Sequence, residues 1–65
     1  MTTKEEITTA IEVMKNVIKK ELESFDLRTD IDYTEANHMQ WLKENFPTIG
    51  CLCYMLKLAQ DELKK

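Results

Sequence analysis

The last third of the chain has a helical pattern that is apolar on two opposite sides, and this constrains the fold more than any other feature. At about 100° per residue, one side of a helix over residues 48–64 carries Ile49, Leu52, Cys53, Leu56, Ala59 and Leu63. The opposite side carries Cys51, Tyr54, Met55 and Leu58. Only a narrow strip made of Gly50, Lys57, Asp61 and Lys64 is polar along the whole length. A helix that is apolar all round is a buried helix, so two separate surfaces have to cover this one.

A long amphipathic helix over about residues 3–24 is expected to cover one of these sides. Thr2 with Glu5, and Thr3 with Glu6, have the spacing of a capping box at a helix start. The apolar residues that follow fall within an arc of about 180°: Ile7, Ala10, Ile11, Val13, Met14, Val17, Ile18, Leu22 and Phe25. The other side of the last helix is left to a short helix, to a second copy of the chain, or to a different protein.

The segment 25–33 breaks the helical period. Apolar or large residues alternate with charged ones from Phe25 to Tyr33, which is typical of extended backbone. Two interpretations remain open: an extended connector, which we favour because it needs no partner, or a two-stranded ribbon made with a second copy. Asp32 and Glu35 then have capping spacing for a short helix over about 34–45, which Pro47 stops or kinks. The last helix then starts at Thr48, or behind Phe46 with Pro47 at its first helical position.

Trp41 is expected to lie away from the core-facing side of the short helix, which carries Ala36, Met39, Leu42 and Phe46. Trp41 either packs sideways over the helix joint or anchors a protein–protein surface, since tryptophan is enriched where binding energy concentrates. The second interpretation predicts a self or partner interface that contains Trp41, His38, Cys51, Tyr54, Met55 and Leu58.

Several function classes find little support in these residues. Cys51 and Cys53 point about 200° apart on a helix and His38 is the sole histidine, so no metal site is expected. A net charge of −3 and the apolar last helix argue against nucleic acid, and the mixed charge of the polar faces argues against a membrane surface. No catalytic motif is present, so neither an enzyme nor a cofactor is expected.

A second function class stays open. Arg28, Tyr33, His38, Trp41 and Lys43 gather around the connector in the sequence and offer cationic and stacking groups. An aromatic ring could stack on a base while a cation meets its charge. The sequence therefore also allows an oligomeric protein that sequesters a small anion or nucleotide in a pocket between subunits.

The sequence as a whole predicts one all-α domain over residues 1–65, a small helical bundle that forms a homo-oligomer, most simply a dimer. A chain of 65 residues buries only about 60% of its unfolded surface, so assembly would add needed burial. We expect a non-enzymatic interaction protein, such as a regulator, adaptor or inhibitor. No secretory signal is recognised at Met1 and the two cysteines are too close for a useful cross-link, so we expect a cytoplasmic location.

Overall fold

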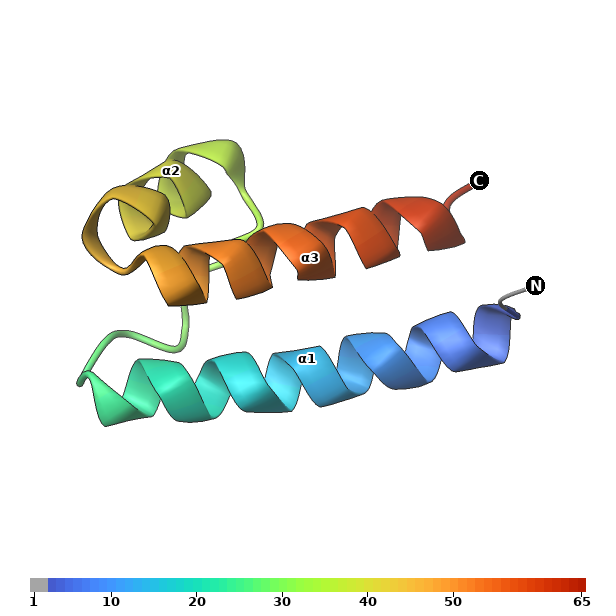
Figure 1. The fold of residues 1–65 in the computed structure, drawn as a ribbon, viewed down its shortest axis with the longest axis horizontal. Coiled ribbons are helices and arrows are strands. Elements are labelled where there is room, and N and C mark those ends of the chain that lie inside the picture. The colour runs from blue at the N-terminus through green and yellow to red at the C-terminus, as the bar shows by residue number, and fades with distance from the viewer. Residues whose placement is uncertain (1–2) are drawn as a thin grey trace.

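The chain folds into three helices in this computed structural model, which describes residues 3–65. Helix α1 is Lys4–Ser24, α2 is Ala36–Asn45 and α3 is Pro47–Leu63 (Figure 1). The described residues contain no strand, which confirms the all-α prediction. No helix among them is both long and apolar enough to cross a bilayer.

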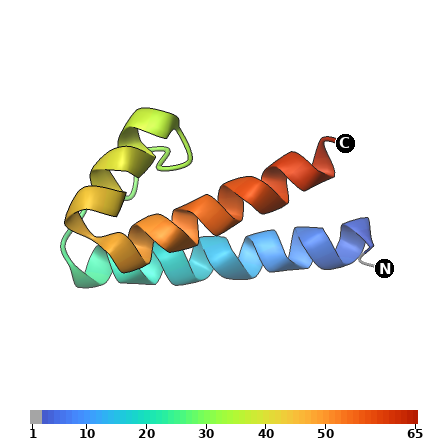
Figure 2. The same cartoon turned by 45° about the horizontal axis from the view of Figure 1, so that its top comes forward.

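Helix α3 is the centre of the fold. It runs antiparallel to α1 along one side and packs its first half against α2 (Figures 1 and 2). The molecule measures 36 × 20 × 19 Å, and its longest axis follows the α1–α3 pair. Within the described residues α2 packs against α3 and makes no helix–helix contact with α1, so it does not connect the two long helices, as a short helix bridging them would.

The core lies where α3 meets α1, the connector and α2. Its buried side chains are Ile11, Ile18, Leu22, Tyr33, Leu42, Ile49, Cys53 and Leu56. Leu42, Ile49 and Cys53 are less than 2% exposed. The apolar arc of α1 is wider than the surface that α3 covers, so Ala10, Val13, Val17 and Phe25 remain exposed although the pattern placed them on the core side.

Helix α1 begins with a capping box at Thr3. The Glu6 amide donates to Thr3 Oγ1 at 3.1 Å, and the Thr3 amide donates to the Glu6 carboxylate at 3.5 Å. Two of the orphan amides of a helix start are satisfied in this way. The alternative pair, Thr2 with Glu5, falls partly outside the described residues.

The predicted cap of the short helix is wrong. Asp32 does not cap α2, because its carboxylate accepts hydrogen bonds from the Thr34 amide at 3.0 Å and from the Thr34 hydroxyl. These bonds form a local turn, so α2 begins at Ala36 behind Glu35, which offers no side-chain cap. Ala36, expected on the core side, is therefore exposed in the first turn.

A single residue joins α2 to α3. Phe46 ends α2, with its amide donating to the Leu42 carbonyl at 2.6 Å, and it also precedes the first residue of α3. Pro47 occupies that first position, where its missing N–H would have had no helical partner anyway. This short joint sets the angle at which α2 returns along α3 (Figure 2).

Candidate functional site

The strongest candidate for a ligand site is a pocket of about 270 Å³ between the connector and α2. Its lining includes Leu27, Arg28, Ile31 and Tyr33 from the connector and His38 and Trp41 from α2. Four of the five residues predicted as ligand contacts thus meet here, namely Arg28, Tyr33, His38 and Trp41. The pocket lies within one chain, whereas the sequence suggested one between subunits.

The fifth predicted residue, Lys43, lies elsewhere. Its ammonium group sits 4.5 Å from the centre of the Tyr54 ring on α3. Lys43 is two residues from Trp41, so the two side chains leave α2 about 200° apart. Lys43 therefore joins α2 to α3 by a cation–π contact and does not line the pocket.

The end of α1 shapes one wall of the pocket. Asp26 has a φ of 57°, and behind it the Leu27 amide donates to the Leu22 carbonyl at 2.8 Å. The Asp26 amide donates to the Glu23 carbonyl at 3.1 Å, which completes the Schellman pattern of a helix C-terminus. This turn brings Leu27 back against the core, beside Leu22.

Inward and outward side chains alternate along the connector, although its backbone forms turns and bends rather than a strand. Leu27 and Ile31 are partly buried and Tyr33 is 8% exposed, while the intervening charged residues face water. Burial raises the pKa of the Tyr33 phenol above its usual value of 10.0, so this ring stays neutral at physiological pH. Leu27 and Ile31 were not predicted as site residues; the alternation was the signal that could have found them.

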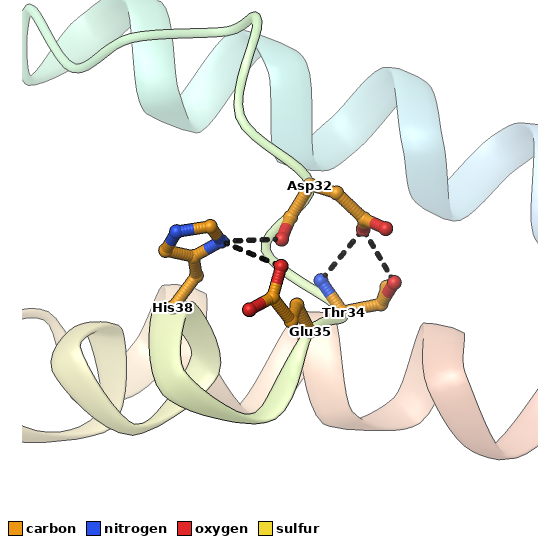
Figure 3. A network of polar contacts seen from close by, with 4 residues as sticks. All are labelled: Asp32, Thr34, Glu35 and His38. Atoms are coloured by element: carbon orange, nitrogen blue, oxygen red, sulfur yellow. Dashed lines mark hydrogen bonds and ion pairs between the residues drawn. The ribbon is translucent and has the colours of Figure 1, made fainter.

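The first turn of α2 fixes His38. Its Nδ1 lies 3.0 Å from the Asp32 carbonyl oxygen and 3.7 Å from a Glu35 carboxylate oxygen (Figure 3). A carbonyl oxygen only accepts, so Nδ1 carries the proton and donates. The imidazole also lies edge-on to the Tyr33 ring, with the ring centres 6.3 Å apart. Asp32 thus fixes His38 through its backbone carbonyl and Thr34 through its carboxylate.

The charge around the pocket is mostly negative. Arg28 donates two hydrogen bonds to the Asp30 carboxylate, at 3.0 and 2.7 Å, so its fork is occupied. This pair lowers the pKa of Asp30 and raises that of Arg28, chiefly through the hydrogen bond. The Asp26 carboxylate lines the pocket as well. Among the described residues, Arg28 is the single cationic side chain of the lining.

Trp41 is 45% exposed and its ring centre lies 6.0 Å from that of Phe46. Phe46 in turn lies 5.2 Å from the Phe25 ring, so a run of three aromatic rings crosses the helix joint. Trp41 therefore packs over the joint, as one interpretation expected, and also faces the pocket.

A second candidate is an apolar surface on the α1–α3 pair, which we name the α1–α3 face: Val13, Val17, Cys51, Met55 and Leu58. Val13, Val17, Met55 and Leu58 are between 42% and 56% exposed, and Cys51 is exposed. The connector packs over the other side of the pair, where a groove is lined by Lys15 and Lys19 of α1 and Cys53 of α3.

Helix geometry places the members of the α1–α3 face together. Val17 is two residues from both Lys15 and Lys19, or about 160° around α1 from each. Cys51 and Met55 are each two residues from Cys53, and so lie about 160° around α3 from it. Both sets therefore lie on the side of the pair that faces away from the connector groove.

The interface predicted from the sequence is divided by this arrangement. Cys51, Met55 and Leu58 belong to the α1–α3 face, whereas Tyr54 lies under Lys43 at the edge of α2. Trp41 and His38 lie on the far side of α2, beside the pocket. Val13 and Val17 were predicted to be in the core; they join the exposed surface because α3 covers only part of the α1 arc.

The groove beneath the connector offers little reactivity. Burial raises the pKa of the Cys53 thiol to about 11, so the thiol is protonated and a poor nucleophile at neutral pH. No cluster of three or more metal-ligating side chains occurs in residues 3–65.

Comparisons with protein-family models, with curated proteins and with solved structures find no match to this chain.

Proposed function

We propose that this chain is a small non-enzymatic interaction protein that forms a homodimer through its α1–α3 face. The observation that carries the proposal is the exposure of Val13, Val17, Cys51, Met55 and Leu58 on two antiparallel helices, on the side that helix geometry places away from the connector groove. Several large apolar side chains exposed on one side of a small protein are typical of a surface that another protein covers. A second copy supplies the same surface in return.

The shape of the face suits such a dimer. Two helix pairs stacked face to face form a four-helix bundle, in which interior apolar positions interdigitate. A stable interface buries roughly 800 Å² per partner, and a molecule measuring 36 by 20 Å across can supply an area of that order. A two-fold axis pairs each residue of the face with the same surface of the other copy.

The stability of so small a chain supports the same proposal. The core of one copy contains few fully buried side chains. Full burial of an exposed Val, Met or Leu contributes about 1.5–3 kcal/mol; these side chains are already about half-buried, so each adds roughly half of that before the entropic costs of association. A dimer thus adds apolar burial that the isolated chain lacks.

Dimerisation would leave Trp41 of α2 and Tyr54 of α3 exposed, as contact points for a different protein. A regulator, adaptor or inhibitor would act by binding a surface of that protein through such aromatic side chains. The free, exposed Cys51 thiol on the face suits a reducing, cytoplasmic setting. Nucleotide sequestration has weaker support, because the Arg28 fork is taken by Asp30 and Asp26 lies beside it.

The test is the subunit count, measured by native mass spectrometry and light scattering over a dilution series. The wild-type chain should be a dimer, and Val17→Glu and Met55→Glu should each give monomers that keep their helical circular dichroism. Asn16→Glu is the matched control, since it adds the same charge one residue away on an exposed position outside the face. A monomeric wild type, or dimers that persist in both variants, would sink the proposal.

A further inference from the structure

The pocket between the connector and α2 is small. Its volume of about 270 Å³ lies just below the range of about 300–1,000 Å³ that is usual for drug-sized ligands. A benzene-sized ring with one substituent fits inside.

The walls of the pocket are apolar and aromatic. Trp41 closes one side with a ring that is 45% exposed, and Tyr33 is held in place by burial. Leu27 and Ile31 complete the apolar lining. Aromatic walls favour a flat ring, which stacks or meets them edge to face.

One polar group can orient a bound ring. Because His38 donates from Nδ1 to the Asp32 carbonyl, the neutral imidazole has its lone pair on Nε2. Nε2 is on the side of the imidazole away from Asp32 and Glu35 in Figure 3, and it has no hydrogen bond from residues 3–65. His38 lines the pocket, so it offers an acceptor there.

The electrostatics disfavour a negatively charged ligand. Asp26 contributes a carboxylate to the lining, and Glu35 stands behind His38. The single cation of the lining, Arg28, is already held by two hydrogen bonds from its guanidinium to Asp30. An anion would meet a guanidinium whose charge Asp30 already balances, and it would be repelled by the carboxylates.

We infer that this pocket binds one aromatic ring that carries an O–H or N–H donor and no negative charge, with the donor directed at His38 Nε2. Phenol is the simplest such molecule, and a tyrosine side chain of another protein has the same chemistry. The inference is independent of the proposed dimer, since the pocket lies beside α2 and none of its lining belongs to the α1–α3 face.

The experiment follows the indole N–H resonance of Trp41 by NMR, since Trp41 is the sole tryptophan in the sequence. Three probes are titrated separately: phenol, anisole and benzoate. Phenol should shift the resonance saturably. Anisole keeps the ring but lacks the donor, so it should bind about three- to tenfold more weakly, the usual value of one hydrogen bond. Benzoate carries the charge that the pocket repels and should not bind.

Two variants and a matched control locate the effect. His38→Phe keeps an aromatic ring but removes the acceptor, so phenol should bind only as well as anisole does. Trp41→Ala should lose binding, followed through the imidazole C–H resonances of His38. Lys43→Ala changes the opposite side of α2 and should leave phenol affinity within about twofold.

Several results would overturn the inference. Anisole binding as tightly as phenol, unchanged selectivity in His38→Phe, or shifts centred on Val17 and Met55 would each contradict it. Absence of saturable binding up to the solubility of phenol would contradict it as well. A final arm compares phenol with N-acetyltyrosinamide: tighter binding of the amide assigns the pocket to a protein side chain, and tighter binding of phenol assigns it to a free aromatic molecule.

Discussion

Gly50 lies so close to Lys43 that a β-carbon added to the glycine would stand 2.8 Å from both the α-carbon and the amide nitrogen of Lys43. Both atoms belong to the backbone of α2, so no rotation of a side chain relieves the contact. The sequence places Gly50 in the polar strip of the last helix; in the structure this position is buried, and it is where α2 approaches α3.

Gly50→Ala should therefore destabilise the fold, although alanine is the better helix former by about 1 kcal/mol. Pushing α2 off α3 costs about 1–3 kcal/mol as an overpacked contact, and also weakens the burial of Leu42. The midpoint of thermal unfolding should fall by several degrees. Thr48→Ala, two residues earlier on an exposed position, is the control and should change it little. An alanine variant as stable as the wild type would mean that the helices are not held this closely.

Asp26→Gly should have the opposite sign. Asp26 has a φ of 57°, a region that glycine adopts without the steric cost that a β-carbon brings. Relief of that cost should raise the free energy of unfolding by about 0.5–1 kcal/mol, measured by urea denaturation. Asp26→Asn separates two causes, because it removes the carboxylate from the helix C-terminus but keeps the side chain. If asparagine gives the whole gain, charge rather than backbone conformation limits stability here.

Helical periodicity predicts much of this fold because burial of apolar residues determines it. Ile11, Ile18 and Leu22 are core residues, and Trp41 lies off the core, as their positions in the pattern indicate. Periodicity does not show how much of an apolar arc a neighbouring helix will cover, which is why Val13 and Val17 were assigned to the core. That division depends on helix spacing and crossing angle, which are properties of the assembled chain.

The site was predictable in part for a related reason. Arg28, Tyr33, His38 and Trp41 are near one another in sequence, and the connector keeps them near in space. Lys43 follows the same sequence logic but leaves α2 on the opposite side. The prediction that Asp32 caps α2 was wrong because its carboxylate accepts hydrogen bonds from the amide and hydroxyl of Thr34, which precedes the start of the helix.

Asp32 should make stability depend on acidity. Hydrogen bonds from the Thr34 hydroxyl and amide lower the pKa of the Asp32 carboxyl below its model-peptide value, so the folded state favours the ionised form. This contribution is present above the unfolded pKa of about 3.9 and is lost as the pH falls through the folded pKa. Asp32→Ala should lose less than about 1 kcal/mol at pH 7, since the group is exposed, and should lose less at pH 2 than at pH 7. Glu12→Ala, an exposed carboxylate in mid-helix, is the control for urea denaturation at both pH values.

The two cysteines should differ sharply in reactivity. Cys51 is exposed, whereas Cys53 is 1% exposed and burial raises the pKa of its thiol to about 11. Titration with a thiol reagent at pH 8 should label Cys51 of the monomeric Met55→Glu variant at once, and Cys53 only when the core opens. Because the folded pKa of Cys53 is raised, its contribution to stability is complete below the unfolded value of about 8.5–9 and decreases as the pH rises towards 11. Cys53→Ala should remove this loss of stability at alkaline pH. Equal labelling rates for Cys51 and Cys53 in the folded Met55→Glu variant would show that Cys53 is not in the core.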